Sequence, residues 1–175
     1  MRRLGVGLML LAALLVAPAL IGSLLPREHA ATSAVTLRAS PDTVWRVVRD
    51  IGRVASWWSD VRTVERVPDA AGREVWRQTL GSNGTLTFVV AVDVPPRRLV
   101  LQLDAPRGAP FGGYWSYEIG PSGGGSRVAV TERGWIGNPI LRLLNRVFFD
   151  EYRTLDSYLR ALGERFREDV TPVHQ

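Results

Sequence analysis

Residues 34–59 read AVTLRASPDTVWRVVRDIGRVASWWS, and they predict a short strand that leads into a capped amphipathic helix. Ser40 can accept hydrogen bonds from the free amides of a first helical turn, Pro41 suits the first helical position, and Asp42 complements the positive end of the helix dipole. Apolar residues then recur at helical spacing on one side of the helix, namely Val44, Val47, Val48 and Ile51. Charged residues occupy the opposite side, namely Arg46, Arg49 and Asp50. The helix therefore begins here, and a second short helix is expected over residues 51–58.

The rest of the chain predicts a sheet closed by a long helix. Strand-like alternation of apolar and polar residues recurs over residues 61–67, 73–80, 86–94, 99–103, 114–119 and 127–135. Asn138 and Pro139 open a last helix by the same capping chemistry. Its expected buried stripe is Leu144, Phe148, Glu151 or Tyr152, Leu155, Leu159, Leu162 and Phe166. A helix of this length can cross a whole sheet.

This order of elements resembles the START-like, or SRPBCC, superfamily, and in particular its polyketide cyclase/dehydrase-like branch. In that branch a strand leads to a helical pair with the loose pattern sPxxVwxvv…dixxxxxWws, matched here by Ser40, Pro41, Val44, Trp45, Ile51, Trp57 and Trp58. The resemblance covers residues 34–168 and implies an α+β helix-grip fold. Such a fold is a curved antiparallel sheet, here of about seven strands, wrapped around a long C-terminal helix.

The first 25 residues predict a membrane anchor. Residues 4–25 are uncharged, and at about 1.5 Å per residue they can cross a hydrocarbon core of roughly 30 Å. Arg2 and Arg3 favour a cytoplasmic N-terminus with the domain outside the cytoplasm. The alternative is a cleaved signal peptide and a secreted domain, although the apolar region of a signal peptide usually has only about 7–15 residues. We therefore expect an anchor over residues 1–25, a linker over 26–33, the START-like domain over 34–168 and a frayed tail over 169–175.

Composition excludes several classes of site. The chain has 175 residues, which fits one domain, and it has no cysteine, so disulfides, thiolate metal sites and a cysteine nucleophile are excluded. His29 and His174 lie at the edges of the expected domain, and we expect no metal and no cofactor. The net charge is +5, but arginines alternate with acidic residues, so nucleic-acid binding is not expected. The sequence does not fix the oligomeric state.

The resemblance implies a mostly apolar cavity between the sheet and the last helix, of the kind that holds lipids, sterols or polyketides. The expected ligand-binding residues in its wall are Trp57, Trp76, Phe88, Trp115, Tyr117, Leu144, Phe148 and Tyr152, each with plain core packing as the alternative. Glu132 continues the alternation of Val128 and Val130, so its carboxylate is expected to point inward unless a bulge turns it to solvent. Trp57 and Trp58 cannot share one direction on a helix, so we expect one of the two to be exposed beside the cavity mouth, with packing against the neighbouring loop as the alternative.

These features predict a membrane-anchored binding protein for a hydrophobic small molecule, in which catalysis is not required. By resemblance, the first alternative is a polyketide cyclase or aromatase that uses the same cavity, with Glu132 or Tyr117 for proton transfer. The second alternative is a partner-binding module of a cell-envelope complex with a tightly filled interior.

Overall fold

The computed structural model describes residues 16–81 and 84–175, and residues 16–24 are helical. The larger part of the predicted membrane span, residues 4–15, lies outside the described residues. Within the described ranges, no helix is both long enough and apolar enough to cross a membrane. The membrane span therefore stays a prediction.

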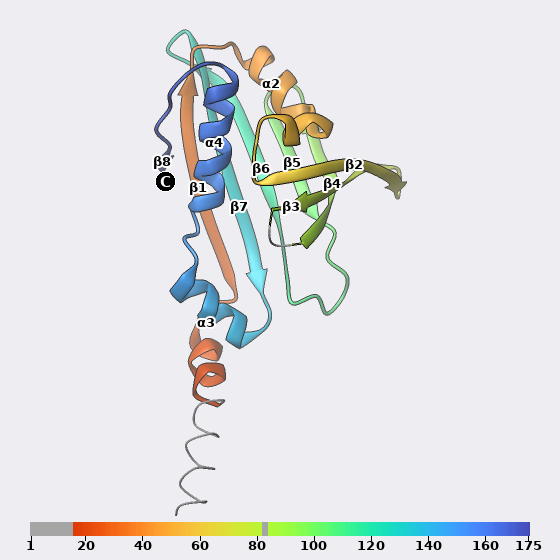
Figure 1. The fold of residues 1–175 in the computed structure, drawn as a ribbon, viewed down its shortest axis with the longest axis vertical. Helices are drawn as coiled ribbons and strands as arrows, with labels where there is room; N and C mark the ends of the chain where they lie inside the picture. The colour runs from red at the N-terminus through yellow and green to blue at the C-terminus, as the bar shows by residue number, and fades with distance from the viewer. Residues whose placement is uncertain (1–15, 82–83) are drawn as a thin grey trace, which may run out of the picture.

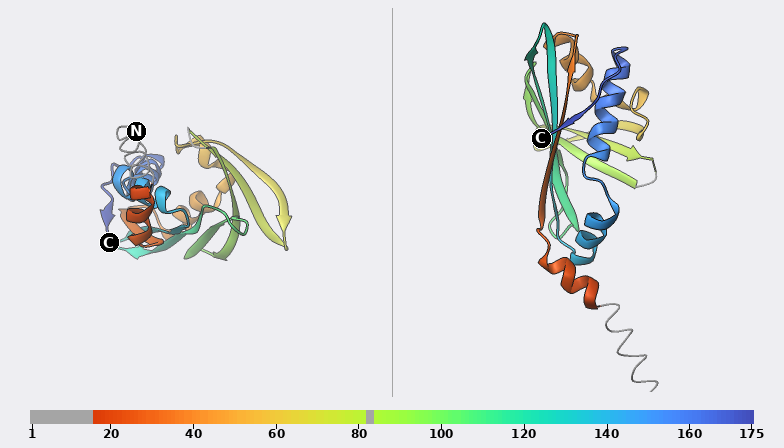
Figure 2. Two further views of the ribbon diagram at one scale, coloured as in Figure 1. Left: turned by 90° about the horizontal axis from the view of Figure 1, so that it is seen from below. Right: turned by 90° about the vertical axis from the view of Figure 1, so that its left-hand side faces the viewer.

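The domain is an antiparallel sheet with helices on one face (Figure 1). In chain order its elements are β1 (Glu28–Leu37), α2 (Pro41–Arg49), η1 (Ile51–Ser56), β2 (Val61–Ala70), β3 (Arg73–Leu80), β4 (Gly84–Val94), β5 (Arg98–Leu103), β6 (Phe111–Ser122), β7 (Gly125–Ile136), α3 (Pro139–Phe148), α4 (Arg153–Arg165) and β8 (Val173–His174). The strand order is β2-β3-β4-β5-β6-β7-β1-β8, and Figure 2 shows how the sheet curves around the helices. The α+β class and the curved antiparallel sheet agree with the predicted helix-grip fold.

Two predictions about the ends of the domain are wrong. Residues 28–33, expected in a linker, form the first half of β1, where the small side chains of Ala31 and Ser33 are buried. The tail adds an eighth strand to the expected seven because His174 Nε2 lies 3.1 Å from Asp156 Oδ2 and its ring stacks on Tyr152 at 3.8 Å. Small and polar residues are typical of a tether, yet here they pair with neighbouring strands.

The single long C-terminal helix that was expected is two helices. Phe149, at the end of α3, has extended backbone angles, with φ −116° and ψ 130°. The side chain of Asp150 then accepts a hydrogen bond from the amide of Tyr152 at 2.9 Å, which offers the backbone an alternative to continued helix. As a result α4 alone lies along the sheet, and α3 lies at the end of the domain next to residues 16–24 (Figure 1).

The two predicted helix starts are confirmed, but their capping differs. Asn138 Oδ1 accepts hydrogen bonds from the amides of Ile140 and Leu141 at 2.9 and 3.2 Å, as a capping residue should. Ser40 precedes α2, but its hydroxyl pairs with the hydroxyl of Thr43 at 3.0 Å and makes no cap bond to the backbone. Helix α2 therefore begins at the predicted residue with only its proline and acidic residue to favour the start.

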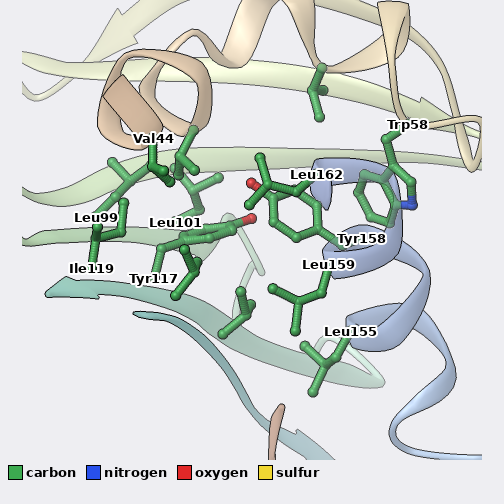
Figure 3. Close-up of a cluster of buried hydrophobic side chains, with 14 of the residues drawn as sticks. Val44, Trp58, Leu99, Leu101, Tyr117, Ile119, Leu155, Tyr158, Leu159 and Leu162 are labelled. Carbon is green, nitrogen blue, oxygen red and sulfur yellow. The ribbon is translucent and has the colours of Figure 1, made fainter. Parts of the chain in front are cut away.

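The core lies between the sheet, α2 and α4 (Figure 3). Its fully buried side chains include Leu37, Val44, Leu99, Val128, Val130, Leu155, Leu159 and Leu162. Aromatic rings close the core on one side, where Tyr158 meets Trp58 edge-on at 5.2 Å and 89°. The expectation that one of the two tryptophans is exposed is wrong, because the turn after η1 directs the Trp58 ring inward and leaves Trp57 half-buried.

Candidate functional site

Two adjoining cavities lie between the sheet and the C-terminal helices. The outer cavity has a volume of about 510 Å³, and its lining includes residues of β4, β6, β7 and α3. The inner cavity has a volume of about 220 Å³ and extends towards Trp58 and Tyr117. Leu86, Phe88 and Trp115 line both cavities, so the two spaces share one wall. Exposed side chains at the rim, including Phe111 and Trp135, show that the outer cavity reaches the surface.

The break between α3 and α4 explains the open volume. In α4, Leu155, Leu159 and Leu162 are fully buried against the sheet, so this half of the domain is filled. Helix α3 is displaced to the end of the sheet and contributes Leu141 and Leu144 to the lining of the outer cavity. A continuous helix would carry the packed core further along the sheet, whereas the break leaves a cavity of a size typical of small-molecule sites.

Glu132 is the acidic group of the outer cavity. It lies on β7 directly opposite Trp115 of β6, and its Oε2 accepts a hydrogen bond from the Trp115 indole nitrogen at 3.0 Å. Its Oε1 lies 3.5 Å from His29 Nε2. The predicted inward orientation of Glu132 is therefore confirmed, and the carboxylate has both a neutral donor and a titratable partner.

His29 gains a raised pKa from this arrangement. The hydrogen-bonding contact with Glu132 is the largest cause, and the charges of Glu132 and Glu151 act in the same direction. Burial of the imidazole opposes the shift, because desolvation disfavours the charged ring, but it does not cancel it. The pair can therefore donate or accept a proton at the cavity wall.

Glycines let the rings approach the sheet closely at this site. A Cβ atom at Gly134 would overlap the His29 ring at 2.6 Å, and one at Gly112 would lie 2.9 Å from the Trp135 indole. Real Cβ atoms do not approach other heavy atoms so closely. The two glycines therefore leave the space that the His29 imidazole and the Trp135 indole occupy beside β7 and β6.

Tyr117 lies deeper, where it lines the inner cavity and contacts other aromatic rings. Burial raises the pKa of its phenol, and the charge of Glu132 raises it further. Tyr158 behaves in the same way, because burial and the neighbouring Tyr117 raise its pKa. Their ring centroids are 5.4 Å apart. Both phenols therefore stay protonated over the physiological range, and Tyr117 can act as a hydrogen-bond donor.

The structure divides the predicted wall residues into two groups. It brings five of them to the cavities: Phe88, Trp115, Tyr117, Glu132 and Leu144. It places the other four elsewhere: Trp57, Trp76, Phe148 and Tyr152. Phe148 is exposed at the C-terminal end of α3, one helical turn beyond Leu144, and Tyr152, which follows the break, stacks on His174. The rings of Trp57 and Tyr158 pack together with their centroids 5.3 Å apart. The Trp76 indole donates a hydrogen bond to Glu74 at 2.5 Å.

His29 and Trp58 line the cavities, although neither was predicted to be a site residue. The missed signal for His29 is alternation, because His29, Ala31, Ser33 and Val35 occupy every second position of β1 and share one face. The linker prediction interrupted this pattern. For Trp58, the orientation depends on the backbone after η1, which local periodicity does not specify. Among the described residues, no group of three or more His, Cys, Asp or Glu side chains could hold a metal ion.

Comparison with known proteins identifies relatives at the levels of sequence profile and fold. The profile of the family described as polyketide cyclase/dehydrase and lipid transport matches residues 28–167. No curated protein sequence matches the chain.

Several solved structures share the fold. TTHA0849 from Thermus thermophilus is 19% identical, with a TM-score of 0.62 over 78% of this chain and 96% of that one. The Zhui aromatase/cyclase from Streptomyces sp. R1128 is 18% identical, with a TM-score of 0.61 over 80% and 94% of the two chains. A truncated norcoclaurine synthase from Thalictrum flavum is 12% identical, with a TM-score of 0.60 over 79% and 93%. Identities this low show a common fold alone.

Proposed function

This chain belongs to the polyketide cyclase/dehydrase and lipid transport family, and from that premise we propose that it binds an apolar small molecule, such as a lipid, a sterol or a polyketide-like compound, in the outer and inner cavities. The observation that carries the proposal is the pair of adjoining cavities, whose largest wall residues are apolar and aromatic. Apolar walls with few polar groups suit a ligand that is poorly soluble in water. The open volume argues against a partner-binding module with a filled interior.

The Glu132–His29 pair indicates that the ligand has a polar end. Glu132 and His29 lie side by side in the wall of the outer cavity, while the surrounding wall offers Phe88, Trp115 and Leu144. A polar group that enters an apolar site without a hydrogen-bond partner is costly to desolvate. The ligand is therefore expected to carry one hydroxyl, carbonyl or carboxyl group that reaches the pair, with the rest of the molecule apolar.

We also propose that residues 4–25 anchor the protein in a membrane, with the N-terminus in the cytoplasm and the domain outside. The support is the uncharged run and the preceding arginines. The helical residues 16–24 end only a few residues before β1 begins at Glu28, so the domain would lie close to the membrane. Alkaline extraction of membranes would leave an anchored chain in the membrane fraction, whereas a shortened soluble product would support a cleaved signal peptide.

The experiment on ligand binding is native mass spectrometry of the full chain released from detergent micelles. We expect a defined apolar adduct that disappears on denaturation. Leu144→Trp should remove the adduct because it adds volume to the cavity lining, whereas Phe148→Trp, on the same helix but outside the lining, should keep it. An adduct-free protein that also takes up no lipid, sterol or aromatic polyketide from a panel would contradict the proposal and favour the partner-binding module.

A second candidate function is a cyclase or aromatase reaction in the same cavity. The observation that favours it is the titratable pair at the wall, since His29 with a raised pKa beside Glu132 can exchange protons with a bound reactive chain. This candidate predicts that Glu132→Gln abolishes turnover of a polyketide substrate but leaves its binding intact. Equal loss of binding and turnover would argue against a catalytic role.

A further inference from the structure

Helix α3 has an exposed apolar face that extends beyond the lining of the outer cavity. Leu141 and Leu144 line the outer cavity, but Ile140, Val147 and Phe148 do not. The exposed fractions of Val147 and Phe148 are 61% and 73%. Contiguous exposed apolar surface on a globular domain usually marks a contact with a partner or a membrane. We call Ile140, Val147 and Phe148 the outer stripe of α3. At about 100° per residue they lie on the same helical face as Leu144, so the apolar surface of α3 runs from the cavity rim to the stripe.

The outer stripe continues into the apolar N-terminal run. Gly22 lies so close to Pro139 that a Cβ atom there would overlap the backbone of Pro139. One nitrogen of the buried Arg142 guanidinium donates a hydrogen bond to the carbonyl of Leu25 at 2.6 Å, just after the helical residues 16–24 end. The exposed side chains of those helical residues include Leu20, Ile21 and Leu24. The N-terminal run is therefore held against α3, and both present apolar side chains to solvent.

The cavity rim adjoins this apolar surface. Phe111, Trp135 and Phe149 are exposed, and all three line the outer cavity. Aromatic side chains of this kind are enriched at the boundary between water and lipid. Helix α3 carries no carboxylate, and its exposed charged side chain is Arg146, because Arg142 is buried against Leu25. No charge on the helix itself therefore repels an anionic headgroup layer.

We propose that the outer stripe of α3 lies in the interfacial layer of a lipid bilayer and holds the mouth of the outer cavity against the membrane surface. The inference rests on the proposed function, because it assigns to that same cavity a ligand that is drawn from the bilayer. We identify the layer that covers the outer stripe as a lipid bilayer because residues 4–25 form an uncharged run long enough to enter one. The end of this run, at Leu25, is hydrogen-bonded to Arg142 of α3. A membrane-dissolved ligand then enters between α3 and β7 without crossing water.

The test uses single-cysteine labelling, since the natural chain contains no cysteine. An environment-sensitive fluorophore is attached to Phe148→Cys in the full chain, which is reconstituted in vesicles of phosphatidylcholine and phosphatidylglycerol. We expect a blue-shifted emission that is quenched by nitroxide-labelled lipids. The matched control is Arg46→Cys, exposed on α2 at the opposite end of the domain (Figure 1), where the label should emit as in water and resist lipid quenching.

A second variant tests whether the side chains of the outer stripe cause the docking. Phe148→Asp combined with a label at Val147→Cys should lose the lipid quenching, although the vesicles still carry the protein. Both positions are exposed, so the substitutions leave the core intact. Equal emission from the labels at positions 148 and 46 would overturn the inference. A blue shift without lipid quenching would also overturn it, because the stripe would then be covered by protein, either a second copy or residues 4–15.

Native mass spectrometry of the same variants separates this inference from the proposed function. An apolar adduct that persists while the label at position 148 stays in water would refute membrane docking and leave ligand binding in place. A lipid-quenched label on a protein that takes up no ligand would refute the binding function and leave docking in place.

Discussion

Replacing Glu132 by glutamine tests the electrostatics of the cavity wall most directly. The substitution keeps the shape of the side chain, and its amide oxygen can still accept the hydrogen bond from Trp115, which is 3.0 Å long in the natural protein. It removes only the charge that lies 3.5 Å from His29. We therefore expect the pKa of His29 to fall, because the carboxylate that raises it is gone while burial of the imidazole, which lowers it, remains.

The magnitude follows from the distance and the exposure of the two groups. Two unit charges 3.5 Å apart in a medium with a dielectric constant of about 20 would attract by roughly 4–5 kcal/mol. The side chains of His29 and Glu132 are 26% and 32% exposed, so water screens much of this attraction. Partly exposed pairs typically contribute no more than about 1 kcal/mol. In a chain of this size, that corresponds to about 2–4 °C in the midpoint of thermal unfolding.

The pH dependence has a definite sign. A histidine whose pKa is higher in the folded state than in the unfolded chain stabilises the fold below its ordinary value of 6.5, and this contribution is lost as the pH rises through the folded pKa. Glu132→Gln should therefore be less stable than the natural protein at about pH 5.5 and nearly equal to it at about pH 9.

Two measurements check this expectation. Thermal unfolding at the two pH values gives the stability difference, and NMR titration of the imidazole protons gives the pKa of His29. The chain has only two histidines, so a His174→Gln variant assigns the signals. An unchanged His29 titration in Glu132→Gln, or a stability difference that is as large at the higher pH as at the lower, would refute the electrostatic reasoning.

Three further outcomes follow from burial and contacts. Leu159→Ala should lower the free energy of unfolding by about 2–5 kcal/mol in a denaturant titration, because the Leu159 side chain is fully buried. Phe148→Ala should change this free energy by less than about 0.5 kcal/mol, because Phe148 is exposed. Equal effects of the two substitutions would contradict the placement of the core. Asp156→Ala removes the carboxylate of α4 that contacts Ser33 of β1 and His174 of β8. Amide hydrogen exchange in β8 should therefore accelerate, and the free energy of unfolding should fall by about 1–3 kcal/mol. Unchanged exchange would show that other contacts hold the tail. Gly134→Ala should displace the His29 ring and reduce the apolar adduct in native mass spectra, and an unchanged His29 signal would argue against the close packing.

The sequence by itself determined the order of elements and much of the core. Proline and an acidic residue at the start of α2, and Asn138 before α3, act on the backbone within one helical turn, so both helix starts were predictable. Strand alternation is likewise a local signal, and it correctly directed Trp115, Tyr117 and Glu132 inward. Features that depend only on neighbouring residues along the chain were therefore available without a structure.

The tertiary structure alone decided the composition of the site. His29 meets Glu132 because β1 pairs with β7 in a register that joins residues about a hundred positions apart, and no local pattern specifies that register. The break at Phe149 and Asp150 depends on the competition between continued helix and a short side-chain turn. It leaves Phe148 exposed at the end of α3 and places Tyr152 against His174. Local periodicity fixes which side of an element is apolar, but the volume that remains between elements depends on how all of them pack together.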